Sequence, residues 1–328
     1  MKPIGAALIG ATGMWGERIA DSVERGGALR LVTCFARDAD RLRSFAARRD
    51  VEAASSLEQA IEHPEVEAVL LVTPNDVHAE QALLCADRGR HVFVEKPIAH
   101  AVEAGEEMRD RFAADGLVLA VGHQMRRLGA ARRAKELIDE GALGTVVLAE
   151  ANWSLPSRLS PAAWRWYRQR APAGPILQLG VHHADTLAYW LGPVASSTGA
   201  FARVATEAES DDVGALTLEF EAGALGVVTG SYVSPRTYFL RVYGTEAVLD
   251  YHADMSVWPA AEKVDAATTL TLRARGKAEL VDFECRDPLV EELDEFARSI
   301  TAEAAPEIGP EEALAALAVV LAGVRNEV

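Results

Sequence analysis

The segment GPILQLGVHHAD, residues 174–185, carries three side chains whose types and spacing suit proton chemistry. Gln178, His182 and Asp185 lie four and three positions apart, which places them on one face of an α-helix. An imidazole exchanges a proton near neutral pH, whereas the amide of Gln178 has no titratable proton and can only orient a hydroxyl group. The second histidine, His183, points about 100° away on such a helix, which favours packing in a core or an interface.

A second candidate group lies in VEKPIA, residues 94–99. Lys96 follows an apolar run that predicts a strand, and in a parallel sheet the carboxyl ends of the strands line the ligand crevice. There an ammonium group can lower the pKa of an alcohol being oxidised or donate to a carbonyl being reduced. Pro97 indicates a rigid peptide bond, for which the cis form is one option. The alternative is a surface lysine paired with Glu95.

A glycine-rich turn stands near the start of the chain, in LIGATGMWGERIA. Gly10, Gly13 and Gly16 separate a predicted strand from a predicted helix, where a dinucleotide pyrophosphate needs close approach to the backbone. The spacing is G-x-x-G-x-x-G rather than G-x-G-x-x-G, so a turn without a ligand is the alternative. The cofactor contacts expected here are Gly10, Ala11, Thr12, Gly13, Met14 and Trp15.

The end of the second predicted strand bears on the choice of cofactor. A carboxylate at this point would bind the ribose 2′-hydroxyl of NAD, but the sequence has Ala36 and Arg37 instead. A small residue followed by an arginine leaves room and a counter-charge for a 2′-phosphate. Asp38 complicates this interpretation unless it caps the next helix. We therefore expect NADP(H) in preference to NAD(H).

Alternating strands and helices organise the first part of the chain. Nearly uniform apolar strands are expected at 4–10, 29–35, 66–72, 91–95 and 117–122, with helices between them. This pattern predicts an α/β Rossmann domain with a doubly wound parallel sheet over residues 1–122. Residues 123–328 are β-rich, with a hairpin turning at Ala222-Gly223 and helices at the end. They predict a second domain of α+β type on a mostly antiparallel sheet, with the option that its final helices pack back on the first domain.

Composition narrows the class of protein. The chain has 328 residues, 49% of them hydrophobic, and a formal net charge of −16, which disfavours binding to nucleic acid. No apolar run is long enough to span a membrane. Three scattered cysteines, Cys34, Cys85 and Cys285, favour a reducing, cytoplasmic setting. The spacing of His182 and His183 to nearby carboxylates is not that of a metal site, so no metal is expected.

Several motifs together resemble the glucose–fructose oxidoreductase/inositol dehydrogenase family (Gfo/Idh/MocA). VTPNDVH (72–78), VEKPIA, GALGTVV (141–147), LGVHHAD and YGTEAVLDY (243–251) recur there in this order, so that the resemblance covers nearly the whole chain. It implies hydride transfer between a nicotinamide cofactor and a secondary alcohol or ketone of a sugar, cyclitol or related polyol. It also implies that the sheet of the second domain is open-faced and forms the contacts of a homodimer or homotetramer.

The resemblance assigns roles to individual residues. Lys96 is similar to the lysine beside the nicotinamide, and His182 inherits an acid/base role. The further cofactor contacts implied are Thr73, Pro74, Asn75, His78, Glu95 and Pro97. The family's block reads D-x-G-x-H-x-x-D, so that Gln178 departs from it while Asp185 fits. Either Lys96 and His182 carry proton transfer without carboxylate support, or position 178 serves substrate recognition.

Substrate contacts are expected around this block. Aromatic faces and arginines in PAAWRWYRQRAPAGP suit sugar rings and hydroxyl groups, and two polar residues follow the last strand of the first domain. The expected substrate-binding residues are Gln178, Gln124, Arg126, Trp164, Arg165, Arg168 and Asp185. Two other functions stay open: cleavage of a glycosidic bond by transient oxidation on a retained cofactor, and a non-catalytic protein that senses a dinucleotide.

Overall fold

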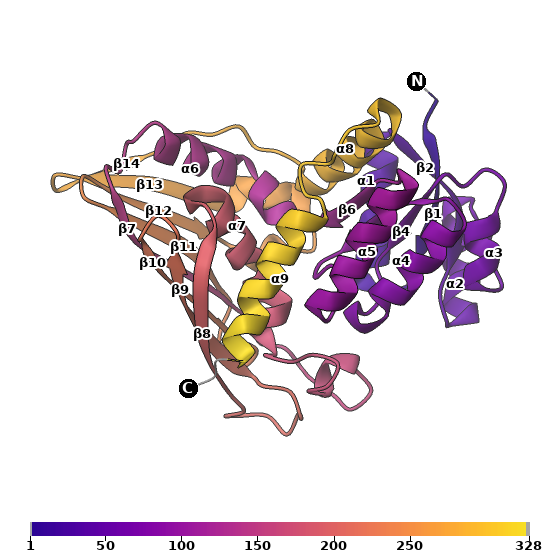
Figure 1. Ribbon diagram of the computed structural model, residues 1–328, viewed down its shortest axis with the longest axis horizontal. Coiled ribbons are helices and arrows are strands. Elements are labelled where there is room, and N and C mark those ends of the chain that lie inside the picture. The colour runs from indigo at the N-terminus through magenta and orange to yellow at the C-terminus, as the bar shows by residue number, and fades with distance from the viewer. Residues whose placement is uncertain (1, 326–328) are drawn as a thin grey trace. The chain divides into compact units, whose positions relative to one another are not determined.

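The computed structural model describes residues 2–325, which divide into two compact units (Figure 1). The first unit comprises the described residues up to His123 together with Leu289–Leu314. The second comprises Gln124–Pro288 and the described residues from Ala315 onward. No helix among residues 2–325 is long and apolar enough to cross a membrane.

The first unit is built on a six-stranded parallel sheet, which confirms the predicted Rossmann architecture. Its order is β3-β2-β1-β4-β5-β6. The strands are β1 (Ile4–Ile9), β2 (Leu29–Phe35), β3 (Glu52–Ala53), β4 (Ala68–Leu71), β5 (His91–Glu95) and β6 (Leu119–Gly122). β1, β4 and β5 are buried along their whole length or nearly so, because helices cover both faces of a parallel sheet. The two-residue edge strand β3 was not predicted.

The helices of this unit lie between the strands along the chain, in the predicted alternation (Figure 1). They are α1 (Met14–Gly26), α2 (Ala39–Arg49), α3 (Leu57–Glu62), α4 (His78–Asp87), α5 (Val102–Asp115) and most of α8 (Pro288–Ala302). The C-terminal segment completes this core: the Phe296 ring lies 6.0 Å from that of Phe93, and the Ile308 carbonyl accepts a hydrogen bond from the Val121 amide. The first unit is therefore assembled from two separate stretches of the chain.

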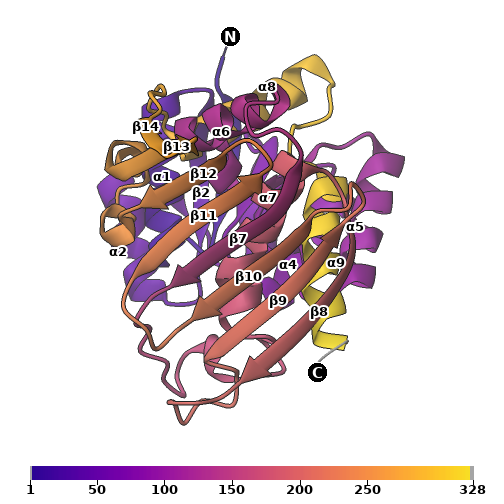
Figure 2. The ribbon, with the colours of Figure 1, turned by 90° about the vertical axis from the view of Figure 1, so that its left-hand side faces the viewer.

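The second unit holds an eight-stranded mixed sheet of order β14-β13-β12-β11-β7-β10-β9-β8 (Figure 2). The strands are β7 (Val146–Ser154), β8 (Val194–Ala202), β9 (Val213–Phe220), β10 (Leu225–Ser231), β11 (Thr237–Gly244), β12 (Val248–Ala253), β13 (Thr268–Ala274) and β14 (Lys277–Leu280). Only β7 and β10 pair in parallel, so the expected mostly antiparallel sheet is confirmed. Gly223 turns the β9–β10 hairpin with a φ of +90°, as the sequence predicted.

Helical segments line one face of this sheet. They are η2 (Gln124–Arg127), α6 (Gly129–Asp139), η3 (Trp164–Trp166), a π-helical turn (Ile176–Gly180), α7 (Val181–Leu191), three short turns (Met255–Val257, Ala261–Lys263 and Asp265–Ala267) and α9 (Pro310–Arg325). The Asp265 carboxylate accepts the amides of Gly129 and Ala130 and so fixes the start of α6. In Figure 2 the opposite, strand-lined face is turned to the viewer.

Candidate functional site

The glycine turn between β1 and α1 is closely packed against its own surroundings. Gly10 has a φ of +93°, and a Cβ there would lie 2.7 Å from the Val72 carbonyl oxygen. A Cβ on Gly16 would lie 2.3 Å from the Ala11 carbonyl oxygen, so this glycine lets α1 pack against the turn. Gly13 is the N-cap of α1 and has no side chain that could cap the helix. The first amides of α1 are thus available to an anion.

The end of β2 gives the turn a positively charged border. Arg37 is exposed, and Asp38 accepts the Arg41 amide at 3.0 Å, so that this acid caps α2. The Arg41 guanidinium donates to the Thr12 carbonyl oxygen of the glycine turn at 2.5 Å. Sequence reasoning missed Arg41. Its only signal was its position one helical turn after the predicted cap Asp38.

The segment after β4 presents a buried amide. Asn75 is 2% exposed, and within residues 2–325 neither atom of its side-chain amide has a hydrogen-bond partner. Leaving such a group buried and unsatisfied costs about 1–3 kcal/mol, so a ligand that supplies a donor and an acceptor here is favoured. Together with the first turn of α1, which has no side-chain cap, this amide fits a dinucleotide cofactor. Thr73 donates to Gln81 at 2.7 Å, which fixes the start of the segment.

His78 stands behind this segment at the first residue of α4. The ring is 1% exposed, with Nδ1 2.9 Å from the Pro97 carbonyl oxygen and Nε2 2.9 Å from the Thr73 carbonyl oxygen. Burial lowers the pKa of His78, while its two carbonyl contacts oppose that shift. Both nitrogens therefore face the protein.

Lys96 follows the last residue of β5 and is half-buried. The Lys96–Pro97 peptide bond is cis. Since β1, β4 and β5 are adjacent parallel strands, the glycine turn, the Asn75 segment and Lys96 all follow the carboxyl ends of neighbouring strands. This is the edge at which open parallel sheets bind their ligands.

Glu95 is buried directly before this lysine. Burial raises the pKa of the Glu95 carboxyl to about 7, although the positive charges of Lys96 and Arg18 oppose the shift. The Arg18 guanidinium stacks over the Trp15 ring at 5.0 Å from its centroid. Glu95 and Trp15, both expected at the cofactor, are thus linked through Arg18 within the first unit.

We expect Glu95→Gln to change the pH dependence of stability. The pKa of Glu95 is about 7 in the folded chain and near 4.5 in the unfolded chain. The carboxyl therefore stays protonated to a higher pH in the folded protein than in the unfolded chain. The stability due to this group is fully present below about pH 4.5 and is lost as the pH rises through about 7. When thermal unfolding is measured from pH 5 to 8, the unfolding temperature of wild type should therefore fall relative to that of Glu95→Gln. Parallel curves for the two proteins would refute this expectation.

In the second unit, the histidine block begins in a π-helical turn. Gln178 lies within this turn, whereas His182, His183 and Asp185 lie on α7. The expectation of one regular α-helix through Gln178 and Asp185 is therefore wrong, because the wider turn changes the angular spacing of Gln178 to the other two. Gln178 and His182 are both buried.

The two adjacent histidines have different surroundings. The His183 ring lies 5.0 Å from that of Tyr238 and 6.1 Å from that of Trp153, within an aromatic core. Burial lowers the pKa of His183 to about 4, so the ring is neutral at physiological pH. The His182 ring lies 5.4 Å from that of Trp153. The core interpretation of His183 is confirmed.

Asp185 forms a buried ion pair with Arg126. The Arg126 Nε donates to one carboxylate oxygen at 2.8 Å, and a second guanidinium nitrogen donates to the other. The Arg126 guanidinium also lies 5.3 Å from the centroid of the Tyr189 ring. The pair joins η2 to α7 and so holds the helix that carries His182.

Gln124 precedes this ion pair in η2 and is fully buried. In the part of the chain that the structure describes, neither its amide oxygen nor its amide nitrogen has a hydrogen-bond partner. An amide with both a donor and an acceptor to offer is suited to a hydroxyl-bearing ligand. This surrounding is compatible with the expected substrate contact.

The expected aromatic and arginine residues lie in a loop braced by a second loop. The Arg165 guanidinium stacks on the Trp164 ring, 4.4 Å from its centroid. Ser210 donates to the carbonyl oxygens of Arg165 and Trp166, through its hydroxyl group and its amide respectively. Arg168 lies 3.8 Å from Asp211. Trp164 and Arg165 are half-buried and Arg168 is exposed.

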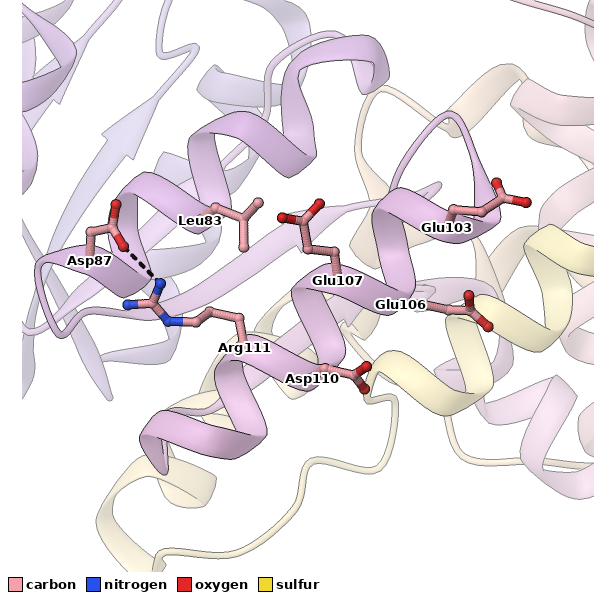
Figure 3. A pocket seen from close by; sticks show the side chains of 7 residues that line it. All are labelled: Leu83, Asp87, Glu103, Glu106, Glu107, Asp110 and Arg111. Carbon is pink, nitrogen blue, oxygen red and sulfur yellow. Dashed lines mark ion pairs between the residues drawn. The ribbon is translucent and has the colours of Figure 1, made fainter.

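A separate hollow of about 800 Å³ lies on α4 and α5 (Figure 3). It is lined by Leu83, Asp87, Glu103, Glu106, Glu107, Asp110 and Arg111, none of them an expected site residue. Its acidic side chains would repel a phosphorylated cofactor. Among residues 2–325, no group of three or more His, Cys, Asp or Glu side chains is arranged to hold a metal ion.

A parallel sheet with a glycine turn, followed by a large mixed sheet, defines the class of two-domain NAD-binding oxidoreductases. Residues 4–123 match the oxidoreductase family with an NAD-binding Rossmann fold, and residues 131–250 match the GFO/IDH/MocA C-terminal domain. The chain belongs to the Gfo/Idh/MocA family.

Individual relatives agree with this membership. A 1,5-anhydro-D-fructose reductase of Ensifer adhaerens is 33% identical over 187 residues, which are 56% of this chain and 55% of the relative. The chain thus spans little more than half the length of that reductase. A D-xylose 1-dehydrogenase [NADP(+)] of Haloarcula marismortui is 26% identical over 93% of this chain and 86% of its own.

Solved structures share the fold over the whole chain. A protein from Desulfitobacterium hafniense, provisionally described as an NADPH-dependent oxidoreductase, is 36% identical with a TM-score of 0.95, and the match covers 99% of this chain and 96% of that one. A levoglucosan dehydrogenase solved with NADH and levoglucosan has a TM-score of 0.85 at 18% identity, covering 99% and 97% of the two chains, which is a likeness of fold.

Proposed function

We propose that the protein transfers a hydride between a nicotinamide cofactor and a secondary alcohol or ketone of a sugar, cyclitol or related polyol. One observation carries this proposal: the glycine turn, the buried Asn75 amide and Lys96 follow the ends of three neighbouring parallel strands. Relatives named for anhydrofructose and xylose support the substrate class.

The proposed cofactor contacts are the backbone of the glycine turn, the Thr73–Asn75 segment and the end of β5. When bound, the nicotinamide supplies the hydride acceptor or donor. Lys96 and His182 are the groups that we propose for moving the proton at the substrate oxygen. Gln178 and Gln124 orient hydroxyl groups through their amides, and Trp164 with Arg165 contacts the substrate ring or its polar groups.

Cofactor titration is the direct test. Purified protein should quench or enhance the fluorescence of NADPH on binding, and it should turn over at least one member of a panel of sugars, cyclitols and polyols. Binding of neither NADPH nor NADH would refute the proposal. Glycoside hydrolysis without net change in NADPH would support the alternative in which the cofactor is retained through the cycle.

The preference for NADP(H) gives a sharper prediction. Arg37 is exposed beside the turn, and a charged hydrogen bond to a phosphate contributes about 1.5–3 kcal/mol. We therefore expect Arg37→Ala to weaken NADPH binding roughly 10- to 100-fold and to leave NADH binding within about twofold. Fluorescence titration with both cofactors measures this, and Arg43→Ala, on the same helix as Arg41 but paired with Asp40, is the matched control. Equal loss for both cofactors would contradict the assignment.

We also propose a homodimer or homotetramer in a reducing compartment. Phe239 alternates along β11 with the buried Tyr238 and Leu240, its ring centroid lies 5.7 Å from that of His252 on β12, and Leu225 is 53% exposed on β10. Exposed apolar side chains on a broad sheet are suited to a partner surface. Analytical ultracentrifugation tests the oligomeric state, and a monomer at micromolar concentration would refute the proposed oligomer.

The three cysteines are free, which agrees with the proposed reducing conditions.

A further inference from the structure

One buried imidazole faces two backbone acceptors in the first unit. The Nδ1 of His78 lies 2.9 Å from the Pro97 carbonyl oxygen, and the Nε2 lies 2.9 Å from the Thr73 carbonyl oxygen. A neutral imidazole has one N–H, so it can donate to only one of these oxygens. The position of that proton decides which backbone segment the ring holds.

The electrostatic surroundings make the neutral ring the main form at physiological pH. Burial is the largest influence and lowers the pKa of His78. The charge of Lys96 lowers it further, whereas Asp76 and the two carbonyl contacts raise it. The ring therefore carries a single proton.

The two acceptors differ in their access to water. The contact to Pro97 is buried, whereas the contact to Thr73 is only partly buried. A buried carbonyl without a donor pays its full desolvation cost, while a partly exposed one can accept from water. The proton is thus better placed on Nδ1, facing Pro97.

Pro97 follows Lys96 directly, so its carbonyl lies on the same short backbone segment as the lysine. We propose that His78 is a positioning residue: its Nδ1–H donates to the Pro97 carbonyl oxygen and thereby fixes the backbone that carries Lys96. This role rests on the proposed function, in which Lys96 moves the proton at the substrate. In it His78 acts through Lys96 rather than by touching the cofactor.

Three substitutions separate the two contacts. The amide nitrogen of asparagine can take the place of Nδ1, that of glutamine the place of Nε2, and phenylalanine keeps a ring without either donor. We expect His78→Asn to keep kcat within about threefold of wild type. We expect His78→Gln and His78→Phe to lower kcat by roughly 10- to 100-fold, since a displacement of about 1 Å at a reacting group has such an effect.

NADPH affinity and thermal unfolding are measured on each variant beside kcat and KM. The role requires that the Gln and Phe variants bind NADPH within about threefold of wild type while kcat falls, and that Asn rescues kcat. Equal behaviour of the Asn and Gln variants, or unchanged kcat in His78→Phe, would overturn it. A merely structural role would lower the unfolding temperature without this split.

A measurement on wild type is independent of turnover. Long-range ¹H–¹⁵N NMR of protein labelled at histidine nitrogens distinguishes a protonated Nδ1 from a protonated Nε2. A protonated Nδ1 on His78 at neutral pH supports the hydrogen bond from this nitrogen to the Pro97 carbonyl oxygen, and a protonated Nε2 refutes it. If wild type turns over no substrate but shows the Nδ1 proton, the proposed function fails while the contact to Pro97 stands.

Discussion

Lys96→Met is expected to lower kcat by roughly 10²- to 10⁴-fold, the usual effect of removing a group that transfers a proton in the transition state. Methionine keeps a similar unbranched stem but has no ammonium group. Because the glycine turn and the Thr73–Asn75 segment, which we propose to bind the rest of the cofactor, follow β1 and β4, NADPH affinity should stay within about threefold. Stopped-flow measurement of the hydride step and fluorescence titration of NADPH together test both parts.

Lys96→Arg is the matched control. An arginine keeps the positive charge, but its pKa is too high for it to exchange a proton near neutral pH. We expect it to bind NADPH as wild type does and to recover less than about a tenth of the lost activity. Turnover by Lys96→Met within tenfold of wild type would remove this lysine from the mechanism.

Arg126→Met is expected to destabilise the protein by about 3–5 kcal/mol, because it removes the guanidinium that donates two hydrogen bonds to the buried Asp185 carboxylate. Both residues are nearly inaccessible to water, at 6% and 1% exposure, and they share two hydrogen bonds. The effect should appear as a lower denaturant midpoint, followed by the fluorescence of the tryptophans. Loss of the pair should also displace His182, since the pair holds α7, which carries this histidine, against η2.

A double-mutant cycle distinguishes loss of the pair from loss of packing. Replacing both charges, as Arg126→Met with Asp185→Leu, should recover most of the stability, because removal of a whole buried ion pair is often nearly neutral. Additive losses in the double variant would show that Arg126 and Asp185 act independently. An unchanged midpoint for Arg126→Met alone would show that the pair does not stabilise α7.

The parallel sheet could be predicted because its strands are apolar on both faces. The segments at β1, β4 and β5 have no alternation of polar and apolar residues, and helical segments separate them, which is typical of a parallel sheet covered on both faces. The edge strand β3 could not be predicted, because its two residues, Glu52 and Ala53, are exposed and too few to form a pattern. Turn chemistry identified the β9–β10 hairpin, since Gly223 adopts the positive φ that its turn requires.

The residues of the candidate site were proposed from the sequence one by one, whereas their pairings were not. Lys96 could be proposed because a polar residue directly after an apolar strand lies at the ligand edge of a parallel sheet, whereas Asn75 was implied by the family resemblance alone. The pairing of Arg126 with Asp185 spans 59 positions, and each residue alone has the chemistry of a substrate contact. The π-helical turn at Gln178 has no sequence signature, so the expected regular helix was the simpler interpretation.

The return of the chain to its first unit has a consequence for protein engineering. Suppose that the nucleotide-binding half were exchanged with that of a relative by a single cut after His123. Phe296 would then lose its native packing partner Phe93, and Ile308 would lose its native hydrogen bond to β6. A chimaera should therefore carry Leu289–Leu314 along with the donor's first 123 residues. Fragments that end at the boundary would expose an aromatic surface and are expected to aggregate.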